Sequence, residues 1–211
     1  MHIFSFKEKT IINSEAILQE LFKTKRLTLA KYSTITCIGD ISFGEDTTFT
    51  GHSYFSDGVS LEKGCIISDT IIESNTNVRP YSILTKIQVG KNNLLGPFCF
   101  VRDDCNIQND CIIGAHVEVA RSKISSGVKI SHRAYVGDAI IGQNTIIGAN
   151  VVFCNFDGKS RQTCIVGSNV ILGSGSLIIS PLSIGNNTII GAGSILTKDV
   201  SDNVKIIQKR L

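Results

Sequence analysis

The sequence predicts an all-β protein: a parallel β-helix shaped as a triangular prism, with a short N-terminal helical cap. Three observations predict this fold. Apolar residues recur every six positions over most of the chain. Departures from six recur on every third unit. The composition, 42% hydrophobic over 211 residues, suffices for one core and one main domain.

The six-residue repeat is read from the apolar residue that opens each unit. Runs of such units start at Phe43, Val89 and Val166, and glycine often follows the opening residue, as in Ile184-Gly185. A helix would need apolar spacings of three and four, and an isolated strand would need strict alternation. Six residues of strand, with the first and fifth side chains inward, make a flat side about 20 Å long. Three such sides close one coil.

The irregular units test the three-sided interpretation. Units of five residues begin at Ile67, Leu84, Val119 and Val136, and the unit from Phe153 carries a long insertion. Counted from Phe43, all five fall on every third unit. A triangular prism predicts this distribution, because deletions and loops then gather at one corner while the other two sides stay regular.

The ends of the stack need protection, because each coil buries its apolar face only against a neighbour. We expect residues 1–36 to form an N-terminal end cap, residues 37–200 the prism and residues 201–211 a tail. Apolar residues between Ser14 and Arg26 have helical spacing, with Ser14 as the N-cap. The alternative for this helix is a partner-binding role.

The seven cysteines are interpreted by position. An odd number without CxxC pairs fits neither a disulfide framework nor a zinc ribbon. Four of them fall on the inward step of the repeat, where a small, weakly polar side chain packs well: Cys65, Cys99, Cys105 and Cys111. Cys154 and Cys164, at the edges of the insertion, are the two whose reactivity is worth testing.

Charge and hydropathy narrow the class of protein. The formal net charge is only +3 and the Lys and Arg residues are dispersed, so the basic face that nucleic-acid binding needs is missing. No charged leader with a cleavage site is found, and no apolar run reaches the roughly 18 residues that span a bilayer. We therefore expect a cytoplasmic protein that binds neither nucleic acid nor membrane.

One histidine stands in a column of small residues. A coil of 17 residues places Ala115 below His132 and Ala149 above it, and Ser174 and Ala192 continue the column. A file of small side chains with one imidazole predicts a shallow groove for an extended ligand. A lone histidine on a repeat protein is more often a plain surface residue, but the column favours catalysis.

The insertion after Phe153 is expected to border this groove. Asp157-Gly158 is a turn signal, and the Asn155 amide can both donate and accept hydrogen bonds. Lys159 and Arg161 add positive charge.

From about Leu95 to Leu211 the chain resembles a known family, and two motifs carry most of the resemblance: a histidine-tyrosine-glycine-aspartate stretch, and an asparagine-aromatic-aspartate-glycine loop after it. The matching stretches are Gly96-Pro97-Phe98, Gly114-Ala115-His116-Val117, His132-Arg133-Ala134-Tyr135-Val136-Gly137-Asp138, Ile147-Gly148-Ala149-Asn150 and Cys154-Asn155-Phe156-Asp157-Gly158. This is the acetyltransferase domain of the bifunctional N-acetylglucosamine-1-phosphate uridyltransferase and glucosamine-1-phosphate acetyltransferase family, whose transferase domains are built from hexapeptide repeats.

The resemblance implies a left-handed β-helix, against the usual right-handed rule for parallel crossovers. It also implies a homotrimer with active sites between neighbouring prisms. The uridyltransferase domain is not expected, since no Gly-rich nucleotide-binding sequence precedes the prism and only about 40 residues are available there.

The resemblance further implies the reacting groups and the acetyl-CoA site. His132 would be the general base that takes the proton of a sugar amine, and the Ala149 N–H would stabilise the oxyanion. Ser174 and Ala192 would line the path of acetyl-CoA, a co-substrate. Lys209 and Arg161 would meet the coenzyme A phosphates, and no metal is required.

The acceptor side follows in the same way. Arg102, Tyr135 and Asn155 match positions that hold the sugar phosphate and the sugar. Glu118 matches a carboxylate associated with the base, although coil arithmetic stacks it under Tyr135. Arg121 lies beside the place of a phosphate-binding lysine.

The sequence departs from the family pattern around the acceptor. The phosphate-binding lysine is replaced by Ala120, and Ile146 and Phe156 replace an asparagine and a tyrosine near the sugar. Such losses predict a retained reaction type with altered acceptor specificity. The expected function is acetyl-CoA-dependent N-acetylation of an amino sugar, first of all glucosamine-1-phosphate. The alternative acceptor is another amino sugar, free or nucleotide-linked, of surface polysaccharide synthesis.

Two rival classes remain at this level. A metal hydratase on this fold needs three converging histidines, and no pair among His2, His52, His116 and His132 is separated by the few residues that would bring two imidazoles onto one metal. A non-catalytic trimeric scaffold is the more serious rival, because the prism would look the same without catalysis.

Overall fold

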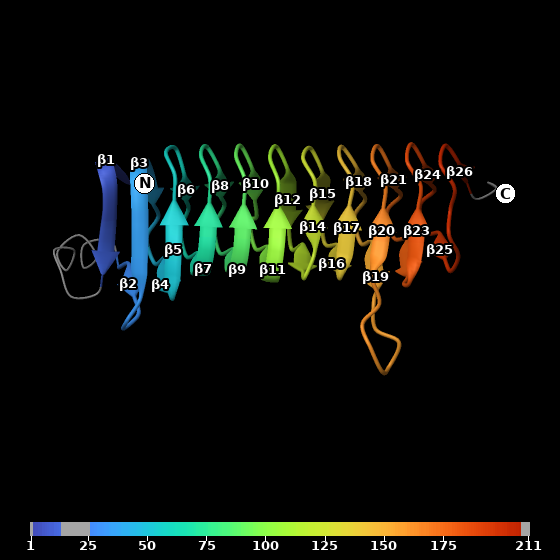
Figure 1. Cartoon of the computed structure of the whole chain (residues 1–211), viewed down its shortest axis with the longest axis horizontal. Helices are drawn as coiled ribbons and strands as arrows, with labels where there is room; N and C mark the ends of the chain where they lie inside the picture. Colours follow the sequence, from blue (N-terminus) through green and yellow to red (C-terminus); the bar gives the residue numbers. More distant parts are fainter. Residues whose placement is uncertain (1, 14–25, 208–211) are drawn as a thin grey trace.

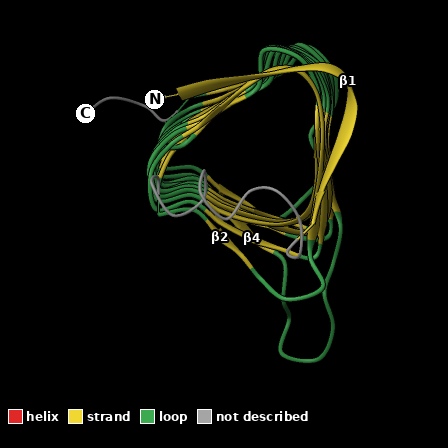
Figure 2. Cartoon of the chain, turned by 90° about the vertical axis from the view of Figure 1, so that its left-hand side faces the viewer, coloured by secondary structure: helices red, strands yellow, loops and turns green. Residues whose placement is uncertain are grey.

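The structure, a computed structural model that describes residues 2–13 and 26–207, is a three-sided prism of stacked parallel strands (Figure 1). Viewed along its axis, the coils superpose into a triangle with strands on the sides and turns at the corners (Figure 2). The regular elements of the described residues are all strands. No helix long and apolar enough to cross a membrane occurs among these residues.

Each coil contributes to three walls, whose strands pair in parallel with those one coil away. Wall 1 holds β2 (Thr28–Leu29), β4 (Thr48–Thr50), β13 (Glu118–Ala120), β16 (Tyr135–Gly137), β19 (Val152–Cys154), β22 (Leu177–Ile179) and β25 (Ile195–Leu196). Wall 2 holds β5 (His52–Phe55), β14 (Lys123–Ile124), β17 (Ala139–Ile141), β20 (Cys164–Val166) and β23 (Leu182–Ile184).

Wall 3 holds β6 (Ser60–Leu61), β8 (Asn77–Val78), β10 (Leu94–Leu95), β12 (Ile112–Ala115), β15 (Lys129–His132), β18 (Ile146–Ile147), β21 (Ile171–Leu172), β24 (Ile189–Ile190) and β26 (Lys205–Ile206). Three strands turn the corner from wall 1 to wall 2: β7 (Ile66–Ile72), β9 (Ile83–Val89) and β11 (Phe100–Ile107). β3 (Thr34–Phe43) continues from wall 2 into wall 3. The parallel pairing therefore runs from Thr28 to Ile206.

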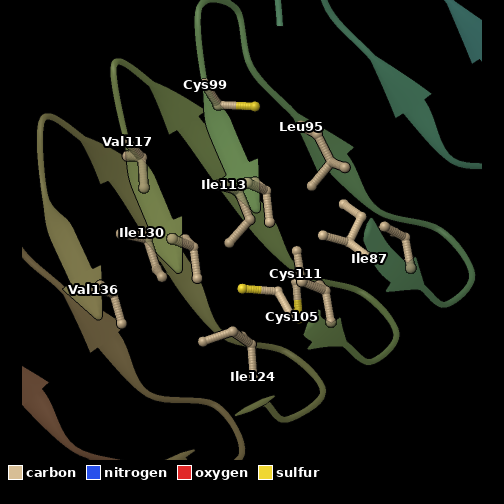
Figure 3. Close-up of a cluster of buried hydrophobic side chains, with 14 of the residues drawn as sticks. Ile87, Leu95, Cys99, Cys105, Cys111, Ile113, Val117, Ile124, Ile130 and Val136 are labelled. Atoms are coloured by element: carbon tan, nitrogen blue, oxygen red, sulfur yellow. The ribbon is translucent and has the colours of Figure 1, made fainter. Parts of the chain in front are cut away.

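The core is one continuous cluster of apolar side chains that come from all three walls. The opening residues of the hexads, such as Leu95, Ile113 and Ile130, are fully buried, and each contributes about 1.5–3 kcal/mol of burial free energy. The inward cysteines lie among them, as Figure 3 shows for Cys99 and Cys105. Hexad periodicity thus translates directly into one continuous core.

The cysteines are free thiols, and burial separates the two that the sequence singled out. Cys154 is half-buried, whereas Cys164 is fully buried and burial raises its pKa to about 12. Of these two thiols only Cys154 is partly exposed, because the side chain of Cys164 turns into the core. Cys65 and Cys99 are buried as expected, with pKa values raised by burial to about 11 and about 12.

The three corners differ in their residues. The asparagine corner, between walls 2 and 3, is a ladder of side-chain amides that includes Asn169, Asn187 and Asn203. Each amide in this set is hydrogen-bonded to the next one, at 3.1–3.2 Å. The histidine corner, between walls 3 and 1, contains His132. The loop corner, between walls 1 and 2, contains the insertion.

All five irregular units meet at the loop corner, as predicted. The shortened units turn there through single residues with positive φ, such as Asp69, Lys86, Arg121 and Asp138. The insertion leaves between β19 and β20 and projects away from the prism (Figure 1).

The N-terminal end of the prism is capped by a strand. β1 (His2–Asn13) pairs antiparallel with β3 along two walls, with a register shift between Phe6 and Thr10. The Phe4 ring packs on Phe43 with ring centroids 5.6 Å apart. The predicted helix falls on residues 14–25, outside the described residues, and the end cap that the structure shows is β1.

Candidate functional site

The histidine corner carries the column that the spacing predicts. Ala115 pairs with His132 between β12 and β15. Above this pair, the residue after each column member donates its N–H to the carbonyl of the member one coil below, at 2.8–3.3 Å: Asn150 to His132, Gly175 to Ala149 and Gly193 to Ser174. These bonds hold Ala115, His132, Ala149, Ser174 and Ala192 in a single file.

The column is open on the C-terminal side of His132. Ser174 and Ala192 are exposed and Ala149 is half-buried. A Cβ added at Gly175, beside Ser174, would meet no atom within 4 Å. Free space therefore runs along this corner above the histidine.

The imidazole of His132 is exposed and has no hydrogen-bond or ion-pair partner among the described residues. The N–H of Ala149 also has no partner in this part of the chain, and the same holds for the N–H groups of Ser174 and Ala192. A general base and an oxyanion donor both need such unused hydrogen-bonding capacity.

Glu118 does not contact His132. Its strand pairs it with Tyr135, as coil arithmetic predicts. Its carboxylate accepts hydrogen bonds from Nε and Nη2 of Arg102, at 3.0 and 2.7 Å. Within the chain, Glu118 therefore holds Arg102 in place and does not orient His132.

A second polar cluster covers wall 1 and the loop corner. We call it the arginine network, and it consists of Arg102, Asp103, Glu118, Arg121, Tyr135, Asp138 and Asn155. The sequence singled out five of these seven, and the structure brings those five together. Wall 1 separates the network's loop-corner end from His132, which stands at the opposite edge of the same wall.

Both arginines are held by carboxylates on two sides. Arg121 makes a two-point contact with Asp138, Nε to Oδ1 at 2.7 Å and Nη2 to Oδ2 at 3.0 Å. Its Nη1 donates to Asp103 at 3.1 Å. Arg102 also pairs with Asp103, in addition to Glu118. Asp103 thus links the two arginines.

The Arg121–Asp138 pair is largely shielded from water, with side-chain exposures of 24% and 14%. Burial alone would raise the pKa of Asp138, but hydrogen bonds from Arg121 and Asn155 hold it below its usual range. The pair is therefore satisfied within the chain, and a ligand would have to displace Asp138 to bind the same face of Arg121.

Tyr135 and Asn155 complete the network. Asn155, 7% exposed, donates its amide to Asp138 and to Tyr135 Oη, the latter at 3.4 Å. The phenol lies across Gly137, where an added Cβ would stand 2.7 Å from Tyr135 Cζ and 2.6 Å from Asn155 Nδ2. Only glycine at 137 leaves room for this arrangement.

The insertion is a closed hairpin. Asp157 accepts backbone hydrogen bonds from Lys159 and Ser160, both at 2.8 Å, and a side-chain bond from Gln162 at 2.9 Å. These bonds lower the pKa of Asp157 to about 2. Phe156, 63% exposed, bridges to Arg161 across the hairpin. The turn predicted at Asp157-Gly158 is confirmed.

Of the two residues expected to contact the coenzyme A phosphates, the structure describes only Arg161. Arg161 is exposed on the loop and close enough to Asp138 to lower the pKa of that carboxyl. Lys209 lies outside the described residues.

Asp103 was not singled out from the sequence, and Gly137 and Asp138 entered only as parts of a family motif, without a role of their own. Asp103, Arg121 and Asp138 stand 18 and 17 residues apart, which is one coil each. An alternation of acid, base and acid at the coil spacing is a signal that predicts stacked ion pairs. The need for glycine at 137 has no such signal, because it depends on where the phenol lies.

An aromatic ladder occupies the histidine corner below His132. Tyr81 and Phe98 stack with centroids 5.5 Å apart, and Phe98 and His116 stack at 5.2 Å. His116, unlike His132, is therefore held by a ring neighbour.

Comparison with known proteins identifies the class. The family model for the bacterial transferase hexapeptide, six repeats, matches residues 86–121 and 163–198. A bifunctional GlmU protein of Baumannia cicadellinicola is 35% identical over 170 residues, covering 81% of this chain and 36% of the relative. One from Acinetobacter baylyi is 33% identical over 189 residues, covering 87% of this chain and 42% of the relative. The chain spans about two fifths of these curated relatives.

A solved structure agrees with the fold. The Arabidopsis UDP-N-acetylglucosamine acyltransferase superposes with a TM-score of 0.57 at 18% identity, over 87% of this chain and 70% of that one. This likeness confirms the left-handed parallel β-helix. The chain is built from the hexapeptide repeats of bacterial transferases and is similar to hexapeptide-repeat acyltransferases. Within them, its curated relatives are GlmU proteins, which confirms the resemblance seen in residues 95–211.

Proposed function

We propose that the protein is an acetyl-CoA-dependent N-acetyltransferase that acts on an amino sugar. The observation that carries the proposal is His132, an exposed imidazole without a partner among the described residues, in a file of small side chains. Open space lies along one side of it, and the polar wall of Tyr135 and Glu118 begins at the next strand. A reactive base between an extended groove and a polar surface suits transfer from a long donor to a sugar.

The reaction follows from these groups. The acceptor amine attacks the thioester carbonyl carbon, and a C–N bond forms. His132 takes the amine proton, while the Ala149 N–H donates to the developing oxyanion. The tetrahedral adduct collapses with cleavage of the C–S bond, and the proton held by His132 goes to the leaving sulfur. The products are the N-acetyl sugar and free coenzyme A.

The column fits the donor. Ser174 and Ala192 present small side chains, and Gly175 leaves the corner bare beside them. An extended pantetheine arm can lie along this edge, with the thioester beside Ala149. We assign Arg161, an exposed loop cation, and Lys209 to the coenzyme A phosphates.

For the acceptor, glucosamine-1-phosphate is the first compound to test, because the sequence resemblance implies it. Another amino sugar, free or nucleotide-linked, is the alternative. Ile146, 42% exposed, supports an altered acceptor, since it offers no hydrogen bond where the family pattern has an amide.

We also propose a homotrimer in the cytoplasm with sites between prisms. Ile146 and Ile171 are adjacent rungs of wall 3, beside the histidine corner, and each is over 40% exposed. A second prism would cover this apolar strip. Seven free thiols are typical of a reducing compartment. Light scattering of the purified chain should give three times its 22.8 kDa mass, and a monomeric mass would contradict the assembly.

The test of the activity is a thiol-release assay with acetyl-CoA and a panel of amino sugars, including glucosamine, glucosamine-1-phosphate and UDP-linked amino sugars. We expect release with at least one acceptor and loss of that release in His132→Ala. The absence of release with every amine would leave a non-catalytic scaffold as the better account.

A further inference from the structure

We infer that Arg102 and Arg121 are positioning residues that do not bind an acceptor phosphate, so the acceptor presents an uncharged, hydroxyl-bearing face of the amino sugar to wall 1. The inference rests on the proposed function and narrows its acceptor class. It reverses the role that resemblance gave to the two arginines.

The first argument is the occupation of the guanidinium groups. An arginine has five N–H donors, and a phosphate is bound best by two that are parallel and unpaired. On Arg121 the pair formed by Nε and Nη2 is already used by Asp138, and Nη1 is used by Asp103. On Arg102, Nε and Nη2 go to Glu118 and Nη1 to Asp103. The side-on face of each guanidinium, formed by Nε and Nη2, is therefore already occupied.

The second argument is charge. Two guanidinium groups face three carboxylates, so the Arg102–Asp103–Glu118–Arg121–Asp138 set carries one negative charge. A phosphate dianion placed there would meet like charge. Further cations lie around the network: Arg161 on the exposed loop, Arg133 at the histidine corner, and Lys123, which lines a small hollow on wall 2 with Arg121 and Asp138. None of them stands on a strand of wall 1.

The third argument is the shape of wall 1 between the arginines. Ala120 pairs with Arg102 on one side and Gly137 on the other, and it is fully buried. The phenol of Tyr135 lies across Gly137. Position 120, where the family pattern has a phosphate-binding lysine, thus holds a covered methyl group, and an aromatic ring lies beside it.

The groups that do remain suit hydroxyls. Tyr135 has a phenolic oxygen that can donate and accept, and each arginine keeps N–H groups that its three carboxylate bonds do not use. Braced arginines also fix Asp138, which in turn fixes the Asn155 amide. The network therefore presents a stiff hydrogen-bonding surface, without a free side-on guanidinium face, to a sugar ring.

The test compares acceptors that differ by one phosphate. In wild type, kcat/KM for glucosamine and for glucosamine-1-phosphate should agree within about threefold. Arg102→Gln and Arg121→Gln should lower both values by the same factor, so that their ratio is unchanged. The ratio does not depend on the folded fraction, which keeps the test valid if a variant folds poorly.

A UDP-linked amino sugar distinguishes a free from a nucleotide-linked acceptor. If it is preferred, and the preference survives both Arg→Gln changes, the phosphates are bound elsewhere and the inference stands. A hundredfold wild-type preference for any phosphorylated acceptor that collapses in Arg121→Gln would overturn it.

Binding separates this inference from the proposed function. Calorimetry with glucosamine and glucosamine-1-phosphate should give dissociation constants within about threefold of each other in wild type, whether or not acetyl transfer is seen. Equal binding without thiol release would contradict the proposed function alone. Selective binding of the phosphate ester that is lost in Arg121→Gln, or no binding of either sugar, would contradict the inference.

Discussion

The histidine corner and the loop corner border the same wall and are built on opposite principles. At the histidine corner, an imidazole and several backbone N–H groups lack partners among the described residues. At the loop corner, Arg121 and Asn155 both donate hydrogen bonds to Asp138. Unused hydrogen-bonding capacity marks groups that can act on a ligand, whereas saturated capacity marks groups that hold shape. The difference assigns chemistry to one corner and positioning to the other.

The largest expected effect is at the open corner. His132→Ala should lower kcat/KM by about 10²–10⁴-fold without changing the melting temperature, because the base is lost while no internal contact is. Thiol release and a thermal melt measure the two. The matched control is His52→Ala, which removes another exposed imidazole, bonded to Thr34 at 2.8 Å, on an early coil. Equal losses in both variants would abolish the distinction between the corners.

At the saturated corner the expected effect is on stability and depends on pH. Asp138→Asn should destabilise the fold by about 1.5–3 kcal/mol at pH 7, because charged hydrogen bonds are lost. The pKa of Asp138 is lowered below its ordinary 3.8 in the fold, so its contribution is present above that value and disappears as pH falls below about 4.

Melting temperatures of wild type and Asp138→Asn should therefore converge in acid. Asp104→Asn is the control, because Asp104 is an exposed neighbour with no described side-chain bond, and its effect should stay within about 0.5 kcal/mol at every pH. A constant difference in melting temperature between wild type and Asp138→Asn from pH 7 to pH 3 would show that the charge of this carboxylate does not stabilise the fold.

A third prediction concerns packing between the corners. Gly137→Ala should destabilise the protein by about 1–3 kcal/mol, because the new methyl group overlaps the Tyr135 ring. Adding Tyr135→Leu removes the ring, so the double variant should lose less than the sum of the two single losses in denaturant unfolding. Strict additivity would mean that the phenol does not lie across Gly137.

The smallest effect is expected in the donor groove. Ser174→Trp should raise the KM for acetyl-CoA about tenfold, equivalent to about 1.4 kcal/mol, and leave the acceptor KM within twofold. Ser183→Trp, an exposed serine on wall 2, should change neither value. An increase in acceptor KM alone would place the donor elsewhere.

The parts of the molecule that depend on spacing could be predicted from the sequence. The hexad places Ile113 and Ile130 inside, and coil arithmetic stacks Ala149 on His132 because every coil repeats one geometry. Side-chain orientation at the corners could not be predicted in this way. Cys164 turns inward and Arg121 folds back onto Asp138, and both outcomes depend on neighbours from other coils.

The N-terminal cap shows a different limit. The apolar spacing predicted a helical cap between Ser14 and Arg26, whereas the strand that caps the prism comes before this segment in the sequence. An open first coil exposes a row of unpaired N–H and C=O groups, and a strand satisfies these where a helix does not. The unpaired N–H and C=O groups of β3 decide which element caps the prism. The local sequence pattern of residues 2–13 carries no information about them.

The direction of β1 also limits how these prisms can associate. A parallel solenoid grows by placing one coil on the next, so two open ends could join head to tail into a fibre. Because β1 runs antiparallel, the edge it presents has the wrong polarity for another parallel coil. The same strand that completes the fold therefore closes one end of it to polymerisation.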